Sequence, residues 1–391
     1  RDVERSRGLG DVYKRQFLGQ SKERKSVPIQ IYSFFSGVGF LDLGFQNANF
    51  DIAFVNEYNE RFLYAYQYAR RNDSHVPHYG YSHLDIRSFL SDDTWNATFP
   101  DYRQKKNILI GFIGGPPCPD FSVAGRNEGK EGKNGQLTSI YVELIIKRKP
   151  DFFLLENVKG LYRTKKHREF YDSIKRKLRR AGYQLFDSIE NSLEYGVPQF
   201  RERLFLVGFS TKTFGKKMKF DLGAHKTACL QTIMQAPWPT ISPFGIDSIL
   251  DCPTGIPVNL TVEYWFAKNN VSTHPNGQDV FGTKAHNKFM TVCEGATRGK
   301  SFKRLHRWRY APTSAYGNNE VHLHPYKARR ISVAEAMAIQ SAPAYFSLPE
   351  NIPLSAKFKM VGNAVPVLLA QGIAESIRDT IFRRLEDNQN G

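Results

Sequence analysis

The residues of this chain best suited to covalent chemistry stand at the ends of apolar, strand-like runs. Cys118 lies in the segment Gly114–Ser122, where two glycines and three prolines surround it, and this segment follows the apolar run Ile108–Ile113. Glu156 likewise closes the apolar run Phe152–Leu155. Open α/β sheets hold their reactive groups at the carboxyl ends of strands, and prolines restrict how far such a loop can wander. The pattern predicts a nucleophilic thiol with a carboxyl group nearby; the plainer interpretation of Glu156 is a cap or a surface carboxylate.

Three polar side chains alternate along a later extended segment. Gln199, Arg201 and Arg203 share one face of this segment because side chains of a strand alternate between its faces. Polar groups entering an apolar strand are costly unless a partner satisfies them. That partner could be a base carbonyl, a carboxylate or a phosphate. The alternative is a structural salt bridge with Glu202 or Glu194.

A glycine turn near the start of the chain is typical of a cofactor site. Phe35, Gly37 and Gly39 lie between a predicted strand and the apolar run that follows. Glycines at such a turn let a ligand approach the backbone, and Glu57, which ends the next strand candidate, suits a ribose diol. The plainer alternative is a tight turn between packed elements. NAD is disfavoured because the third glycine of its fingerprint is missing.

Together these motifs resemble those of the cytosine-C5 DNA methyltransferases. The segment around Cys118 is similar to the Pro-Cys nucleophile loop of that family. Four other segments match further motifs of the family in the family's order: Phe34–Phe40, Glu156–Val158, Tyr195–Phe205 and Met360–Pro366. The resemblance implies that Cys118 attacks C6 of a cytosine, that Glu156 contacts N3, that Arg203 holds O2 and that Arg201 supports the site. It also implies S-adenosyl-L-methionine as cofactor and a target base flipped out of double-stranded DNA.

The same resemblance implies which residues hold the cofactor. It places the first motif at the methionine part, Glu57 at the ribose hydroxyls and Asp85 at the adenine amino group. The full set is Phe35, Gly37, Gly39, Glu57, Asp85, Ile86, Pro117, Leu137, Asn363 and Ala364. Asp85 could equally cap a short helix at Ser88–Leu90. Two departures from the family pattern stand in the first motif: its usual Asp is replaced at Ser33 or Phe34, and its third glycine by Phe40.

The order of elements predicts an α/β fold. Strand-like and helix-like patterns alternate in the first half, as in a largely parallel sheet covered by helices. The strand candidates are Gln30–Phe35, Asp51–Glu57, Asn107–Ile113, Asp151–Glu156, Gln184–Glu190 and Arg203–Phe209. The helix candidates are Glu60–Arg71, Thr138–Arg148, His167–Ala181, Ser332–Gln340 and Val367–Leu385. With the resemblance, this is a Rossmann-like S-adenosylmethionine-dependent methyltransferase domain with a smaller, loop-rich target-recognition domain.

Changes in amino-acid composition and helical periodicity along the chain predict the domain limits. Residues 1–26 are expected to be a non-native or disordered tail. Residues 27–211 with 355–391 form the expected catalytic and cofactor-binding domain, and residues 212–354, rich in Gly, Pro, Asn and Thr, the target-recognition domain. Charged, glycine-rich Gly125–Gly135 is expected to act as a lid over the DNA.

The basic run Arg298–Arg309, with aromatics interleaved, is expected to contact DNA phosphates and base edges. The candidate DNA-binding residues are Ser122, Gln199, Arg298, Lys300, Lys303, Arg304, Arg307 and Arg309. The alternative for the basic run is a solvated face. His322 and His324 are interpreted as structural or DNA-facing rather than as metal ligands.

Composition limits the partners. The formal charge of +17 favours a polyanionic partner, nucleic acid first. No apolar run reaches the ~18 residues needed to span a bilayer, so no membrane partner is expected. Four dispersed cysteines favour neither a disulfide framework nor structural zinc, and favour a reducing compartment. We expect no metal and a cytoplasmic monomer that shares its DNA site with a restriction endonuclease without forming a stable complex. The rival expectations are a tRNA cytosine methyltransferase and a non-catalytic DNA-binding relative.

Overall fold

The computed structural model describes residues 27–73, 75–104, 107–117, 133–162, 164–282, 286–299, 301–313, 316 and 321–390. The expectations for Cys118, Ser122, Lys300 and residues 1–26 fall outside these ranges, as does most of the expected lid at Gly125–Gly135.

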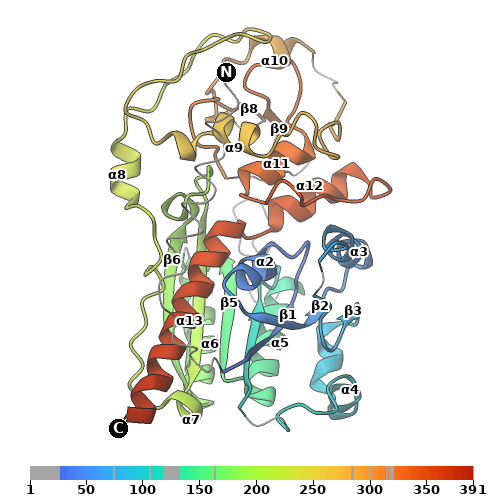
Figure 1. The fold of residues 1–391 in the computed structure, drawn as a ribbon, viewed down its shortest axis with the longest axis vertical. Helices are drawn as coiled ribbons and strands as arrows, with labels where there is room; N and C mark the ends of the chain where they lie inside the picture. Colours follow the sequence, from blue (N-terminus) through green and yellow to red (C-terminus); the bar gives the residue numbers. More distant parts are fainter. Residues whose placement is uncertain are drawn as a thin grey trace, which may run out of the picture.

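A seven-stranded sheet forms the centre of the large domain, with strand order β3-β2-β1-β4-β5-β7-β6 (Figure 1). All neighbouring strands are parallel except β7, which runs antiparallel to both β5 and β6. The strands are β1 (Ile29–Phe34), β2 (Asp51–Asn56), β3 (Tyr81–Ser82), β4 (Leu109–Gly114), β5 (Phe152–Val158), β6 (Tyr183–Asn191) and β7 (Glu202–Ser210). The six predicted strands are confirmed to within two residues at each end. Their apolar runs are continuous because both faces of the sheet are covered.

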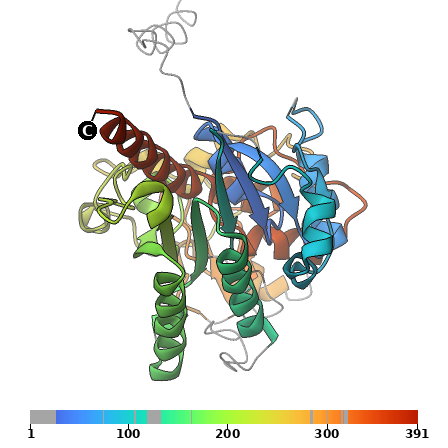
Figure 2. The ribbon, with the colours of Figure 1, turned by 90° about the horizontal axis from the view of Figure 1, so that it is seen from below.

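Helices cover both faces of the sheet, so the large domain has three layers (Figure 2). One face packs against α2 (Phe40–Asn47), α13 (Val367–Asn390) and part of α3 (Glu60–Ala69). The other packs against α4 (Asp92–Thr98), α5 (Lys133–Arg148) and α6 (Lys165–Arg180). Three strands are followed by short 3-10 helices: η1 (Ile86–Leu90), η3 (Lys159–Tyr162) and η4 (Ser192–Tyr195).

The segment Leu354–Asp387 has the length and hydropathy of a membrane-spanning helix, and 67% of its most apolar window is buried inside the protein. It comprises α12 (Leu354–Asn363) and α13, which meet at Ala364. A Cβ atom on Gly44 of α2 would lie 2.4 Å from the Cβ of Ala370, so glycine lets α2 and α13 approach closely. This packing identifies α13 as a core helix of the fold.

The smaller domain lies beyond the carboxyl ends of the parallel strands (Figure 1). Its elements are short, which are α8 (Leu230–Gln235), η5 (Val258–Leu260), α9 (Val262–Lys268), α10 (His286–Thr291), β8 (Phe302–Arg304), β9 (Val321–Leu323), α11 (Val333–Ile339) and α12. The predicted helix near Ser332 is confirmed, and Ser332 and Glu335 form the predicted capping box. Apolar residues of α2 and α3 share a core cluster with this domain, so the two domains pack directly against each other.

The residues after β7 stay with the large domain for longer than the composition indicates. Helix α7 (Thr211–Phe214) and the loop after it contribute Phe214, Met218 and Leu222 to the core beneath α13. This packing favours a domain boundary after Leu222 rather than at residue 212.

Candidate active site

An ion pair between Glu156 and Arg203 lies at the carboxyl end of the sheet. Glu156 stands near the end of β5 and is only 8% exposed. The register of β5 and β7 puts Arg203 opposite Val158, on the face of the sheet that Glu156 also occupies. The Nε atom of Arg203 lies 3.2 Å from Oε1 of Glu156. The predicted carboxyl group and one predicted arginine are therefore brought together.

Burial and neighbouring charges act in opposite directions on the Glu156 carboxyl. Burial raises the pKa of the Glu156 carboxyl, while the positive charges of Arg203 and Arg201 act in the opposite direction. A carboxyl group with a raised pKa keeps its proton at a higher pH and can donate it to a ring nitrogen. The site thus pairs a proton donor with a fixed cation, which suits a heterocycle with adjacent nitrogen and carbonyl groups.

Arg201 connects the strand end to the C-terminal segment. Its side chain is fully buried, and NH2 donates hydrogen bonds to the backbone oxygens of Gly362 at 2.8 Å and Ala364 at 2.9 Å. Burial lowers the pKa of the Arg201 guanidinium. Its bonds hold the end of α12 against the active site, which agrees with a supporting role.

The backbone that leads to Cys118 passes directly against Glu156. A Cβ atom on Gly115 would lie 2.7 Å from Oε2 of Glu156, so any side chain here would displace the carboxyl group. Pro116 is buried and Pro117 is exposed at the end of the described segment. Cys118 follows Pro117 in the chain, which puts the predicted nucleophile within three residues of a contact with Glu156.

The glycine turn after β1 leaves space for a ligand. Gly37 and Phe35 both have positive φ, 56° and 55°, and a Cβ on Gly37 would meet no atom within 4 Å. Glu57, at the end of β2, accepts hydrogen bonds from the backbone N–H of Gly37 and of Asn59, each at 2.8 Å. Burial raises the pKa of the Glu57 carboxyl.

Other groups at the same edge fit a polar cofactor. The hydroxyl of Ser36 in the turn is buried and has no hydrogen-bond partner among the described residues. Asn363 is exposed at the end of α12, and Leu137 is half-buried on α5, which begins at Lys133 rather than at Thr138. Open space, an acid and an unpaired hydroxyl together suit the predicted S-adenosylmethionine site.

Asp85 occupies the position of a helix cap. Its Oδ1 accepts a hydrogen bond from the backbone N–H of Arg87 at 2.9 Å, and Oδ2 pairs with the Arg87 guanidinium at 2.8 Å. Ile86 behind it is buried. The contacts of Asp85 are therefore those of a helix cap, and its role at an adenine amino group stays a prediction.

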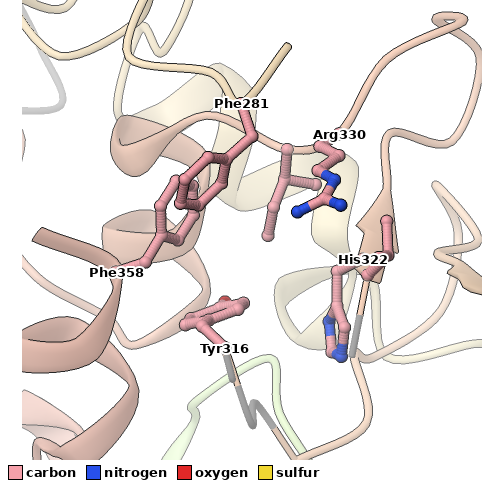
Figure 3. A pocket seen from close by; sticks show the side chains of 7 residues that line it. Phe281, Tyr316, His322, Arg330 and Phe358 are labelled. Atoms are coloured by element: carbon pink, nitrogen blue, oxygen red, sulfur yellow. The ribbon is translucent and has the colours of Figure 1, made fainter. Parts of the chain in front are cut away.

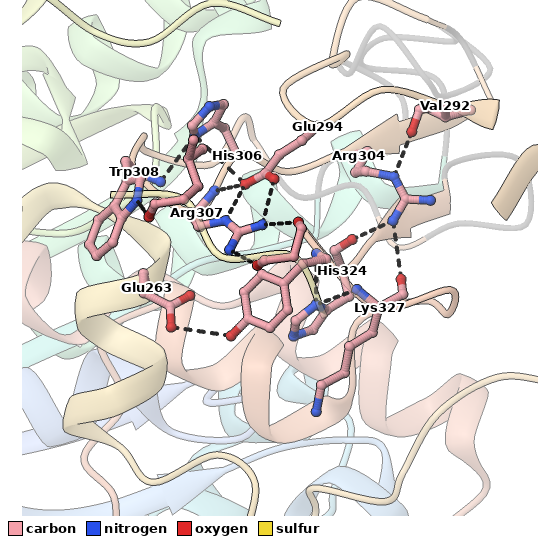
Figure 4. Close-up of polar contacts among 12 residues, drawn as sticks. Glu263, Val292, Glu294, Arg304, His306, Arg307, Trp308, His324 and Lys327 are labelled. Carbon is pink, nitrogen blue, oxygen red and sulfur yellow. Dashed lines mark hydrogen bonds and ion pairs between the residues drawn. The ribbon is translucent and has the colours of Figure 1, made fainter. Parts of the chain in front are cut away.

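Arg304, which the basic run assigned to DNA, is instead fully buried (Figure 4). Its guanidinium stacks on Phe244, with 3.6 Å from Cζ to the ring centroid. It also donates hydrogen bonds to four backbone oxygens, which are those of Phe289, Val292, His324 and Lys327. The DNA assignment of Arg304 is wrong, because these carbonyls use the donors that a phosphate would need.

Replacing Arg304 by methionine is expected to destabilise the protein by about 3 kcal/mol or more, because each unpaired buried carbonyl costs about 1–3 kcal/mol. Urea unfolding followed by fluorescence measures this effect. Arg309→Met is the control, since Arg309 is partly exposed and makes only long contacts, such as 3.4 Å to the Pro239 oxygen. A stable Arg304→Met protein with weakened DNA binding would restore the original assignment.

Arg307 is also buried, at 5% exposure, and the DNA assignment fails for the same reason. It forms an ion pair with Glu294, whose Oε2 lies 2.9 Å from NH2, and bonds to Ser248 (Figure 4). Gln199 is fully buried too, and neither polar atom of its side chain has a partner among the described residues.

The remaining basic candidates are closer to solvent. Arg298 is exposed, and Lys303 and Arg309 are partly exposed. They stay predictions for DNA contacts, as does Lys300. Within the described residues, no group of three His, Cys, Asp or Glu side chains could hold a metal ion.

An aromatic pocket that no sequence pattern predicted lies between α12 and other segments of the small domain (Figure 3). Tyr316 lies over Gly362, where a Cβ atom would come within 3.1 Å of its ring, and packs edge-on against Phe358. Phe281, Arg330 and His322 complete the labelled lining. The Tyr316 ring therefore contacts the same glycine whose oxygen Arg201 binds.

Comparisons with known proteins agree with this geometry. Residues 29–379 match the sequence profile of the C-5 cytosine-specific DNA methylases. The Type II methyltransferase M.NmeDI of Neisseria meningitidis serogroup C is 50% identical over 369 residues, covering 93% of this chain and 86% of that protein. M.FnuDI of Fusobacterium nucleatum, also a Type II methyltransferase, is 30% identical, covering 90% of this chain and 95% of that one.

Solved structures share the fold. A putative DNA modification methyltransferase encoded within a prophage of E. coli superposes with a TM-score of 0.58 at 20% identity, covering 90% of this chain and 99% of that chain. The Dnmt2 methyltransferase of S. pombe gives a TM-score of 0.55 at 14% identity, with 90% and 98% covered. At these identities the likeness concerns the fold alone.

Proposed function

Since the chain belongs to the family of C-5 cytosine-specific DNA methylases, we propose that it transfers a methyl group from S-adenosylmethionine to C5 of a cytosine flipped out of duplex DNA. The observation that carries this proposal is the Glu156 carboxyl, buried beside Arg203 and against the backbone that leads to Cys118. The base must flip out because a base inside a duplex cannot reach the edge of the sheet. Flipping costs a few kcal/mol.

The reaction begins with the flipped cytosine between these groups. The Cys118 thiolate adds to C6, and the electrons of the ring shift toward N3. Glu156 donates its proton to N3, so no negative charge builds up on the ring, while Arg203 holds O2. C5 is then an enamine carbon and can attack an electrophile.

The cofactor supplies that electrophile as a sulfonium methyl group. Residues of the turn after β1, with Glu57, Leu137, Asn363 and Ala364, would hold it at the sheet edge. Transfer of the methyl group to C5 would leave the cofactor as a neutral thioether. Loss of the C5 proton to a water molecule then restores the C5–C6 double bond and expels Cys118 as thiolate, and Glu156 recovers its proton from N3.

The wider assignment follows from the relatives. Both Type II methyltransferases named above match most of this chain, which supports a modification enzyme that shares its site with a restriction endonuclease. Residues 27–222 with the C-terminal helix α13 would then carry catalysis, and the small domain inserted between them would select the sequence. We propose a monomer that works in the cytoplasm, where the DNA is.

The test uses S-adenosylmethionine with a tritiated methyl group and two separate acceptors, mixed-sequence duplex DNA and tRNA. Digestion to nucleosides should place the label in 5-methyldeoxycytidine from the DNA. Label in tRNA alone would contradict the proposal and favour an RNA methyltransferase. DNA binding without any transfer would favour a non-catalytic relative.

A further inference from the structure

A buried carboxylate stands behind the glycine turn. Asp42, in the first turn of α2, is fully buried. Its Oδ1 accepts a hydrogen bond of 2.7 Å from the hydroxyl of Ser33, at the end of β1. This hydroxyl–carboxylate pair joins the strand and the helix on either side of the glycine turn.

Asp42 also joins the turn to α3. Its Oδ2 accepts a hydrogen bond of 2.9 Å from the hydroxyl of Tyr66. The Arg70 guanidinium lies over the Tyr66 ring, 3.9 Å from its centroid. Burying a carboxylate is costly unless its partners are held in place, and here two hydroxyl donors and a neighbouring guanidinium meet it.

The far end of this chain of contacts is the turn itself. Arg70 donates hydrogen bonds to the backbone oxygens of Gly39 at 2.6 Å and Val38 at 3.5 Å. Gly39 has φ of 85°, and a Cβ atom there would lie 2.3 Å from the Tyr66 ring. Tyr66, which Asp42 binds, and Arg70, which stacks on Tyr66, thus hold the backbone at Gly39, next to the open space at Gly37.

We infer that Asp42 is a positioning residue for the cofactor turn, through a carboxylate on the helix that accepts a hydrogen bond from a hydroxyl on the strand. Asp42 does not touch the cofactor; it acts through Tyr66 and Arg70. The inference rests on the proposed function only in taking this turn as the S-adenosylmethionine site.

An exchange of the two residues tests this inference. Asp42→Ser leaves two facing hydroxyls, Ser33→Asp sets two carboxylates against each other, and the double variant S33D/D42S restores one of each. Binding of S-adenosylhomocysteine, measured by calorimetry without DNA, is the readout. Each single variant should lose about tenfold or more in affinity, the size of a lost hydrogen bond to a charged group, and the double variant should recover to within about threefold.

Kinetics give a second, independent readout. The single variants should raise KM for S-adenosylmethionine more than they lower kcat, because the catalytic groups at Glu156 stay in place. Tyr66→Phe, which removes one hydroxyl and keeps the ring, should weaken cofactor binding by a smaller factor in a folded protein. Tyr64→Phe is the matched control, since Tyr64 lies on the same helix, is 44% exposed, and should bind as the wild type does.

The outcomes separate the inference from the proposed function. Folded single variants that bind S-adenosylhomocysteine as tightly as the wild type overturn the role of Asp42, even if methyl transfer to DNA is intact. A double variant that binds S-adenosylhomocysteine no more tightly than the single variants overturns the role of the Ser33–Asp42 hydrogen bond. If the singles fail to fold, an unchanged affinity in Tyr66→Phe overturns the inference. A wild type that binds the cofactor, with rescue by the exchange but no methyl transfer, upholds the inference and contradicts the function.

Discussion

Replacement of Cys118 by alanine is expected to abolish methyl transfer. Without a thiolate to add at C6, C5 of cytosine is too poor a nucleophile for the reaction, and covalent catalysis of this kind is lost as a whole. Duplex DNA that contains 5-fluorocytosine provides the measurement, because fluorine at C5 cannot leave as a proton. The wild type with tritiated cofactor should form a labelled adduct that survives denaturant, and Cys118→Ala should form none.

The matched control for this experiment is Cys229→Ala. Cys229 is an exposed free cysteine next to α8, far along the chain from the strand ends of the active site. It should form the adduct at the wild-type rate. An adduct formed by Cys118→Ala would remove Cys118 from the mechanism, and sequencing the trapped DNA would in either case identify the bound site.

Replacement of Glu156 is expected to have the second largest effect. Glu156→Ala should lower kcat/KM by about 10³-fold and Glu156→Gln by about 10²-fold, within the range of general acid catalysis. Burial raises the pKa of the Glu156 carboxyl. The proton on the neutral acid is needed at N3, so the wild-type rate should fall as pH rises through this raised pKa.

The amide of Glu156→Gln does not titrate, so this falling limb should vanish from its pH profile. Glu202→Gln serves as control, because Glu202 pairs with Lys159 at 3.0 Å outside the buried site. If Glu156→Gln keeps the wild-type rate and the same falling limb, then another group protonates the base.

The sheet and its edge could be predicted because their signals are local. Parallel strands covered on both faces are continuous apolar runs, and the chain places Glu57 and Glu156 directly after two of them. Short helices such as α4 and α9, with seven residues each, show too few turns for a period and are absent from the predicted set.

The basic run shows why the recognition domain could not be predicted in the same way. Arg304 and Arg307 have the spacing and charge of phosphate ligands, but their partners are carbonyls and a carboxylate from other segments of the same domain. A sequence pattern shows which residues are charged, but it does not show which of them the fold buries. Asp42 did carry a local signal, since an acid stands there between the apolar Leu41 and Leu43.

The position of α13 has a consequence for how the chain folds as it leaves the ribosome. This last helix of 24 residues covers one face of the sheet, and its Arg378 donates to the backbone oxygen of Ala48, 330 residues earlier. At about 5–20 residues per second, synthesis of that interval takes roughly 15–65 s. Within this interval the last strand of the sheet, β7, is complete at Ser210, and from then until α13 is made the sheet lacks the helix that covers part of its apolar face, which favours chaperone binding. The newly made chain can close this part of its core only after α13 has left the ribosome.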